Sequence, residues 1–345
     1  MQELLLRVFE RIASYQAEYV YKMTDYNRVV QFAGYNQQTM NIRAIAGELH
    51  TIRDLVRWGM SQFNEAGLCF AHGMPNALDE AVYLCLATLH LPPDLGDEYF
   101  DCRLTHEEKR AVLENYKLRL HKRKPAAYIT REAWFAGLNF YVDERVLIPR
   151  SPIAELIQQQ FSPWIDHDDV RRVLDLCTGS GCIAVACAYA FEQANIVASD
   201  VSRDALDVAA INRSNHGLED RMQLIESDLF ENIPQQEFDI IVSNPPYVPE
   251  QEMAVLDREF SFEPDSGLVA GKTGMDIVVP MLQQAENYLS DHGILVVEVG
   301  YSMPALVQLL PAVPFTWLEF AHGGEGVFLL TAEQLRACKQ MFDAL

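Results

Sequence analysis

From Arg171 onward, short apolar runs that suit β-strands alternate with segments that suit helices, and this alternation restricts the fold more than any other feature of the chain. It indicates a parallel sheet with helices on both faces. The runs at 238–244 and 294–300 are almost continuously apolar, which is typical of strands buried on both sides. The expected strands are 172–176, 196–200, 222–226, 239–243, 294–299, 315–320 and 327–331, and the expected helices include 182–191, 204–216 and 276–289.

The region before Arg171 has a different pattern. At 345 residues the chain exceeds the usual limit for one hydrophobic core, so we expect two domains. Apolar residues such as Ile45, Leu49 and Ile52 recur at helical intervals, and Thr105 with Glu108 matches the capping box of a helix start. The expected divisions are an extension of unknown role at 1–40, a helical substrate-recognition domain at 41–130, a linking β-hairpin at 131–150 and the α/β domain at 151–345. A non-native start before Met40 is one hypothesis for the extension.

The charge balance limits the classes of partner. Asp and Glu total 49 against 27 Lys and Arg, a formal net charge of −22. Binders of nucleic acid normally present a basic face, so we expect no stable nucleic-acid binding and favour a small molecule or a basic protein. No apolar run approaches the roughly 20 residues of a membrane helix, so no membrane association is expected. The 7 scattered cysteines form no disulfide framework, which predicts a cytoplasmic protein.

One basic run departs from this balance. It contains Lys117, Arg119, Lys122, Arg123 and Lys124. It has two interpretations: a solvated helix end, where the helix dipole favours cations, or a docking patch for an acidic partner.

A glycine-rich turn is the first candidate for chemistry. Residues 173–182 read VLDLCTGSGC, which predicts a buried strand, a tight turn and the start of a helix. Gly179 and Gly181 allow close approach of a ligand, and a helix N-terminus offers unpaired N–H groups. Asp175 ends the first strand, and Asp200 ends the second, 21 residues after Gly179 and near the spacing of a ribose-binding acid.

The acid before the turn bears on which nucleotide could bind. Ala184 occupies the third glycine position, where alanine is tolerated, so the turn alone does not exclude NAD. A carboxylate at Asp175 would repel a pyrophosphate and suits a cation, such as the ammonium of S-adenosylmethionine. Asp228, after the third strand, is placed either to accept a hydrogen bond from an adenine amino group or to cap a helix.

The second candidate is Asn244-Pro-Pro-Tyr247, directly after the expected strand 239–243. Two prolines rigidify a loop at the carboxyl edge of the sheet, where ligands bind in such folds. An amide nitrogen is a poor nucleophile because its lone pair is delocalised. The Asn244 side-chain oxygen and the Pro245 carbonyl can accept both hydrogens of a planar NH2 group, which fixes the nitrogen towards a sulfonium methyl and stabilises the developing positive charge. Tyr247 can stack on the planar group and exclude water.

Together, the two motifs resemble those of S-adenosylmethionine-dependent amino methyltransferases. That class includes DNA exocyclic-amine methyltransferases and the HemK-like protein N5-glutamine methyltransferases. The segments 125–130 and 134–153 are similar to the region before the catalytic domain of HemK-like proteins. Release-factor enzymes of that family typically read IPRPDTE where this chain reads IPRSPIAE at 148–155. With WLEFAHGGEGVF at 317–328, the chain looks like the branch that methylates a glutamine of ribosomal large-subunit protein L-three.

The resemblance implies a Rossmann-like class I methyltransferase fold with a seven-stranded sheet. It also implies methyl transfer from S-adenosylmethionine to a glutamine side-chain nitrogen of a basic ribosomal protein, by in-line displacement without a metal. Three alternatives stay open. These are methylation of release factors, methylation of DNA (which the net charge and the lack of a basic target-recognition domain disfavour), and a silent binding protein, which need not keep the Asn244 motif.

Site residues follow from the match to the family. Together with Asp175, the implied cofactor contacts are Cys177, Thr178, Gly179, Ser180, Gly181, Asp200, Asp228, Leu229 and Asn244. The implied glutamine-binding residues are Asn244, Pro245, Pro246 and Tyr247, of which Asn244, Pro245 and Tyr247 are catalytic. Cys177 stands where many members have glycine, which suggests a backbone contact. Leu229 stands where some have tryptophan, so stacking on adenine by this residue is not expected.

Other reactive side chains receive plainer interpretations. Cys177, Cys182 and Cys187 are spaced by five, not by the two intervening residues of thiolate zinc sites, so we expect core residues and no metal. Arg150 could orient a substrate or cofactor, or form a salt bridge with Asp143 or Glu155.

Overall fold

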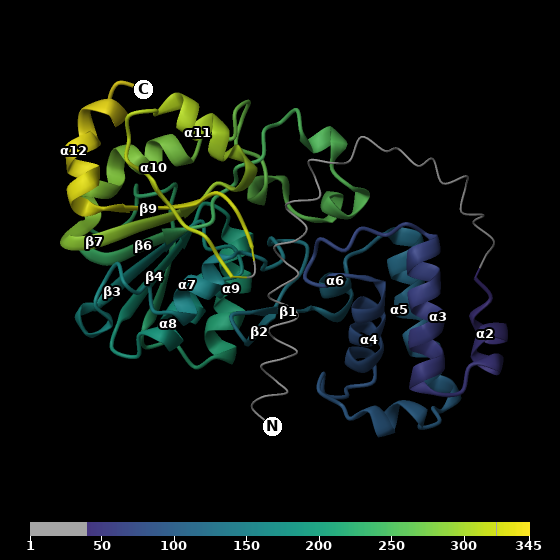
Figure 1. Ribbon diagram of the computed structural model, residues 1–345. Coiled ribbons are helices and arrows are strands. Elements are labelled where there is room, and N and C mark those ends of the chain that lie inside the picture. Colours follow the sequence, from purple (N-terminus) through teal and green to yellow (C-terminus); the bar gives the residue numbers. More distant parts are fainter. Residues whose placement is uncertain (1–39, 322) are drawn as a thin grey trace. The chain divides into compact units, whose positions relative to one another are not determined.

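The computed structural model describes residues 40–321 and 323–345 (Figure 1). The prediction about an N-terminal extension therefore lies, apart from Met40, outside the described residues. Two compact units are present: one runs up to Glu132 and also includes Asp257–Phe262, and the other comprises Ala133–Leu256 and Glu263–Leu345. The hairpin expected as a linker thus belongs almost entirely to the second unit, and a short segment downstream of the Asn244 motif belongs to the first.

The first unit is helical and has its own apolar core. The predicted capping box is present at the start of α5, where Thr105 and Glu108 bond reciprocally, and Thr51 with Asp54 forms another at α3. The helices are α2 (Ile42–Glu48), α3 (Ile52–Glu65), α4 (Ala77–Thr88), α5 (His106–Lys117) and α6 (Ala126–Thr130), with the short helical segments η2 (Asp97–Asp101), η3 (Leu118–Lys122) and η6 (Arg258–Phe262).

The basic run at 117–124 contributes a buried cation to this core. Arg119 is 1% exposed, and its guanidinium donates to Glu80 at 2.5 Å and to Glu259 at 3.0 Å. Arg123 donates to two backbone carbonyls of the same unit, at 2.9 Å each. Both sequence interpretations, a solvated helix end and a docking patch, are therefore wrong for Arg119, because its guanidinium is buried against two acids of the same unit.

The second unit is built around a seven-stranded sheet in the order β5-β4-β3-β6-β7-β9-β8. Each expected strand is present, although β8 is only two residues long and β7 begins five residues earlier than expected. The strands are β3 (Arg172–Leu176), β4 (Asn195–Asp200), β5 (Met222–Glu226), β6 (Phe238–Ser243), β7 (Leu289–Glu298), β8 (Thr316–Trp317) and β9 (Val327–Thr331).

The expectation of a parallel sheet is wrong for its last strand. From β5 to β7 the strands are parallel, but β9 runs antiparallel to both β7 and β8. Only residues 318–326 separate β8 from β9. A parallel crossover needs a dozen or more residues, so this connection is too short and the two strands must pair antiparallel.

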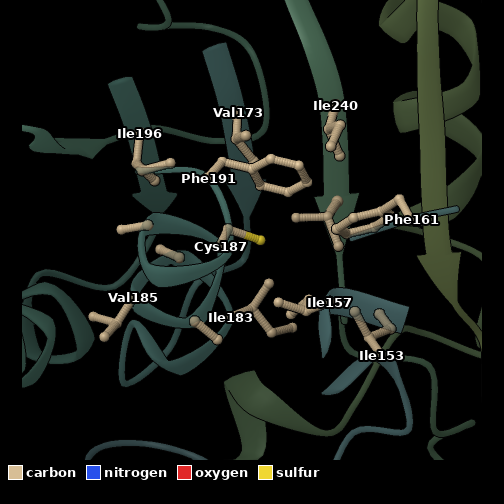
Figure 2. Close-up of a cluster of buried hydrophobic side chains, with 14 of the residues drawn as sticks. Ile153, Ile157, Phe161, Val173, Ile183, Val185, Cys187, Phe191, Ile196 and Ile240 are labelled. Atoms are coloured by element: carbon tan, nitrogen blue, oxygen red, sulfur yellow. The ribbon is translucent and has the colours of Figure 1, made fainter. Parts of the chain in front are cut away.

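Two helical layers cover the sheet (Figure 1). Because successive side chains of a strand point to opposite faces, Val173 and Ile240 pack into one core while Leu174 and Ile241 pack into the other. Figure 2 shows the first core, where Phe191 lies beside Val173 and Ile157 lies near Ile183. Helices α7 (Ile153–Gln158), α8 (Cys182–Ala190) and α9 (Arg203–Asn215) lie on this side, and α10 (Val278–Gln284), α11 (Met303–Leu309) and α12 (Ala332–Phe342) lie on the other.

A separate two-stranded sheet precedes these elements. It pairs β1 (Glu132–Phe135) with β2 (Leu138–Tyr141) around Gly137, as the aromatic segment predicted. Among the described residues, no helix is both long and apolar enough to cross a membrane.

Candidate active site

The loops after β3 and β6 begin side by side at the carboxyl edge of the sheet. Leu176, the last residue of β3, pairs with Ser243, the last residue of β6, and the Ser243 hydroxyl donates to the Leu176 carbonyl at 2.7 Å. The chain continues from β3 to β4 on one side and from β6 to β7 on the other. The two loops therefore flank the topological switch point, where open α/β sheets bind ligands. The fold brings the glycine loop and the Asn244 motif together at that edge.

The glycine loop, residues 177–181, turns through three left-handed positions. The φ angle is +58° at Cys177, +54° at Gly179 and +79° at Gly181. A Cβ at position 181 would lie 3.2 Å from the Ala209 Cβ, so this glycine also permits close packing of α8 against α9. Cys177 adopts a left-handed conformation that glycine reaches without strain.

Asp175 is fully buried beneath the loop. Its Oδ2 accepts hydrogen bonds from the Thr178 hydroxyl at 2.5 Å and from the Ala184 N–H at 3.1 Å, so it holds the loop and the start of α8. Its Oδ1 has no hydrogen-bond partner within the described residues. Burial, with a smaller contribution from the Asp200 charge, raises the pKa of Asp175 to about 7. A ligand ammonium near the loop would stabilise the ionised form of this carboxyl.

Asp200, at the end of β4, is partly exposed. Its Oδ2 accepts from the Gly179 N–H at 2.9 Å, and its Oδ1 accepts from the Ser202 N–H at 2.9 Å. Burial raises its pKa, and the two backbone bonds oppose that rise. Each carboxylate oxygen has room for a second hydrogen bond, so the pair of oxygens can accept two ligand hydroxyls.

Asp228 and Leu229 follow β5 in a turn. Asp228 is exposed, and the segment after it is a series of turns, so the interpretation of Asp228 as a helix cap is wrong. Leu229 has φ +45° and packs into the apolar core with only 9% of its surface exposed. Its side chain is thus turned away from solvent, and the backbone of this turn is what it can present to a ligand.

The Asn244 motif leaves β6 as an extended turn, and the chain after it is held by strand-like bonds. Val248 pairs with Val269 in a parallel bridge, and the Glu250 N–H donates to the Gly271 carbonyl at 2.8 Å. Asn244 is partly exposed, and within the described residues no protein group bonds to its side-chain amide. The Asn244 amide is therefore open to a ligand.

Tyr247 is held at three points. Its phenol donates to Glu298 at 3.1 Å, its carbonyl accepts from the Ser302 hydroxyl at 2.7 Å, and its ring lies against Gly300. Tyr301 meets the ring edge-on, with the centroids 5.8 Å apart. Burial raises the pKa of Tyr247, so its phenol stays protonated and serves as a hydrogen-bond donor within the protein.

Sequence reasoning missed several residues that support the site. The buried side chain of Asn212 in α9 donates to the Ser180 carbonyl at 2.8 Å and accepts from the Tyr141 N–H at 2.8 Å. It therefore joins the glycine loop to β2. Glu298 was also missed. The sequence feature that could have identified Glu298 is an acid at the end of an otherwise apolar strand. No feature of the neighbouring sequence identifies Asn212.

Arg150 pairs with a partner that the sequence did not suggest. Its guanidinium donates to both oxygens of the buried Glu263, rather than to Asp143 or Glu155. Asp143 is instead bonded by Arg145, which lowers the pKa of Asp143 to about 2. The prediction of a salt bridge was therefore right in kind and wrong in partner.

The described residues contain no group of three or more His, Cys, Asp or Glu side chains arranged to hold a metal ion. The cysteines of the α8 region are free thiols, and burial raises the pKa of both Cys182 and Cys187. These thiols are thus poor nucleophiles and ligands at neutral pH.

The acidic side chains at the carboxyl edge of the sheet fit S-adenosylmethionine. Asp200 offers acceptors for ribose hydroxyls, and the unpaired buried oxygen of Asp175 suits a cationic amino group. The turn at Asp228 has an exposed acid that could accept from an adenine amino group. These three groups are carboxylates, which suit a cationic ligand better than a pyrophosphate.

Comparison with known proteins identifies the family. A family model described as "Methyltransferase small domain" matches residues 158–260, which include both loops. The ribosomal protein uL3 glutamine methyltransferase of Francisella tularensis subsp. tularensis is 48% identical over 309 residues, which cover 89% of this chain and 98% of that protein. Its counterpart from Xanthomonas campestris pv. campestris is 50% identical over 295 residues, 85% of this chain and 95% of that protein. The seven-stranded sheet agrees with the Rossmann-like methyltransferase fold expected from the motifs. This chain belongs to the family of ribosomal protein uL3 glutamine methyltransferases.

Proposed function

We propose that this chain transfers the methyl group of S-adenosylmethionine to the side-chain amide nitrogen of a glutamine in ribosomal protein uL3, the large-subunit protein L-three. The observation that carries the proposal is the position of the Asn244–Tyr247 turn beside the glycine loop at one sheet edge. The names of relatives at 48% and 50% identity support the same substrate.

The turn would supply the chemistry of the amide. Bound S-adenosylmethionine provides an electrophilic methyl group. The Asn244 side-chain oxygen and the Pro245 carbonyl accept the two amide hydrogens, which orients the nitrogen and stabilises the positive charge that develops on it. Pro246 restricts the turn, and Tyr247 covers the planar amide. No strong base is required, because the nitrogen becomes acidic once it is alkylated.

The cofactor would be held by the opposite loop. Cys177, Thr178, Ser180 and the two loop glycines contact it mainly through their backbone, Asp200 accepts from the ribose, and the turn of Asp228 and Leu229 borders the adenine. Asp175 offsets the charge of the ligand ammonium. In this scheme no metal takes part, so we expect full activity after dialysis against EDTA.

Charge favours a basic protein partner. The formal net charge of −22 gives long-range attraction towards a basic ribosomal protein and repulsion from free nucleic acid. We therefore expect the rate of association with uL3 to fall as ionic strength rises. The helical unit would contribute to recognition of uL3, and the reaction would occur in the cytoplasm, where ribosomal proteins are made.

The test is methylation of undermethylated uL3 and, separately, of release factors, followed by mapping of the methyl groups with tandem mass spectrometry. We expect one methyl on one glutamine of uL3 and a loss of about 100-fold or more in kcat for Asn244→Ala, the order seen when a single charge-stabilising group is removed. Asn215→Ala, a change of the same type on an exposed helix end, should retain normal activity. Methylation of release factors alone would keep the chemistry and reject the substrate.

A further inference from the structure

A buried carboxyl joins the Asn244 motif to two distant segments of the second unit. Glu298 ends β7 and is 6% exposed. Its Oε1 accepts from the Tyr247 phenol at 3.1 Å, and its Oε2 accepts from the Ser151 hydroxyl at 2.5 Å. These partners lie 51 and 147 residues away in the sequence. Both carboxyl oxygens are therefore engaged by protein hydroxyls, so Glu298 is placed to hold other groups and not to take a proton from a substrate.

The residues after Glu298 restrain the same tyrosine. Gly300 has φ +47°, and a Cβ there would lie 2.7 Å from the Tyr247 ring. The Ser302 hydroxyl donates to the Tyr247 carbonyl at 2.7 Å. Three groups from one short segment thus fix the phenol, the ring and the carbonyl of Tyr247. Two prolines connect Tyr247 to Asn244, so little freedom remains between the fixed tyrosine and the Asn244 and Pro245 oxygens.

The other side of the carboxyl is equally anchored. The Ser151 hydroxyl also accepts from the Ile153 N–H at 3.2 Å, at the start of α7. Burial raises the pKa of Glu298 to about 7, and the hydrogen bonds from Ser151 and Tyr247 and the nearby charge of Arg150 oppose that rise. Glu263 neutralises Arg150. Glu298 therefore links the end of β7 to a fixed helix start.

We propose that Glu298 is a positioning residue for methyl transfer, which holds the Tyr247 phenol and thereby fixes the Asn244 and Pro245 oxygens that bind the glutamine amide. The proposal rests on the function proposed above and adds a residue that touches neither substrate nor cofactor. A misplacement of about 1 Å in such a site can cost 100-fold in rate, so the loss of one restraint should be seen in kcat.

The experiment is a double-mutant cycle in the full chain, with uL3 and S-adenosylmethionine both saturating. Tyr247→Phe removes only the phenolic hydroxyl, and Glu298→Leu replaces the accepting carboxyl with an apolar side chain of similar size. We expect each to lower kcat at least tenfold. The double variant should fall within twofold of the slower single variant, because both changes remove the Tyr247–Glu298 hydrogen bond and only Glu298→Leu also removes the bond from Ser151. Glu298→Gln keeps an acceptor oxygen and should restore kcat to within about threefold of normal.

Controls separate this role from folding and from the proposed function. Tyr189→Phe removes an exposed phenolic hydroxyl that bonds to His216, and it should leave kcat unchanged. Tyr247→Phe should bind S-adenosylmethionine normally in calorimetry, which a general loss of structure would not allow. Normal kcat in Tyr247→Phe, or losses that multiply in the double variant, would overturn the positioning role. If Glu298→Leu does not fold, the kcat values of Tyr247→Phe and Glu298→Gln still test the positioning role. A normal chain that methylates no substrate would instead reject the proposed function.

Discussion

The backbone N–H of Gly179 donates to the Asp200 carboxylate at 2.9 Å, so the acid that ends β4 fixes the middle of the glycine loop that follows β3. This hydrogen bond joins the loop after β3 to the end of β4, at the edge where we propose that the cofactor binds. The loop conformation and the position of the Asp200 carboxylate, the proposed acceptor for the ribose, are then set together, because moving either displaces the other.

Replacing Asp200 should therefore weaken cofactor binding through two effects. Asp200→Ala removes the acceptor for the ligand hydroxyls and the restraint on Gly179. A hydrogen bond to a charged group contributes about 1.5–3 kcal/mol, so we expect S-adenosylhomocysteine to bind about 10- to 100-fold more weakly in calorimetry. Asp220→Ala, which removes an exposed acid after α9, is the control and should bind normally. Equal affinity in both variants would show that Asp200 does not hold the ligand.

Asp175 should make the stability of the ligand-free protein depend on pH. Its pKa is 3.8 in an unstructured chain and about 7 in the folded protein, because burial disfavours the ionised form. Between about pH 4 and pH 7 the unfolded state has lost this proton and the folded state keeps it. Stability therefore falls as pH rises through that window. Burial also raises the pKa of Glu298 to about 7, so that carboxyl contributes in the same direction. Asp175→Asn should therefore reduce the slope without abolishing it, as measured by urea unfolding at several pH values, and an unchanged slope would show that the Asp175 carboxyl ionises freely in the folded state.

Much of the second unit could be predicted from the sequence because its signals are local. The central residues of β3 and β6, Val173–Leu174 and Ile240–Val242, are consecutive apolar residues, as expected for strands that are covered on both faces. The two loops carry unusual residue types directly after such strands. The switch point between β3 and β6 follows from these positions once the strands are known.

The supporting contacts could not be predicted, because they join residues that are distant in the sequence. Arg119 lay in a run of exposed-looking cations, and only the fold shows that Glu80 and Glu259 bury it. Arg150 had two nearby acids to choose from and pairs with Glu263 instead. The direction of β9 depends on the length of the connection after β8, which required the end of β8 to be known.

Gly300 should be intolerant of a side chain because of Tyr247. A Cβ at position 300 would lie 2.7 Å from the ring, so Gly300→Ala must displace it and with it the turn that begins at Asn244. We expect kcat to fall at least tenfold while the protein stays folded. Gly217→Ala provides a matched control, since Gly217 also has a positive φ (+64°) and no neighbour within 4 Å of its Cβ position. It should lose about 1 kcal/mol of stability and no activity.

The buried charges of the helical unit should be essential to its stability. Glu259 is 0% exposed, bonds Arg119 at 3.0 Å and accepts from the Cys69 N–H at 3.0 Å. Breaking a buried pair by removal of one partner leaves an uncompensated charge, which costs about 3–5 kcal/mol. Glu259→Ala should lower the free energy of unfolding by that order in denaturant titrations. The exposed pair of Arg336 and Asp291 gives the contrast, because Asp291→Ala should change little.

Tyr301 should act on the protein substrate rather than on the cofactor. Its side chain is 41% exposed and meets Tyr247 edge-on, so an aromatic surface stands directly beside the turn that would hold the glutamine. Contact of an aromatic ring with a substrate segment contributes about 0.5–1.5 kcal/mol, so Tyr301→Ala should raise the KM for uL3 about 2- to 12-fold and leave the Kd for S-adenosylmethionine unchanged. Tyr189→Ala removes a tyrosine near the end of α8 that is 50% exposed, and it should leave KM unchanged. A fall in kcat at constant KM would instead mean that Tyr301 supports the ring of Tyr247, because the loss would then lie in the orientation of the amide and not in the capture of the protein that carries it.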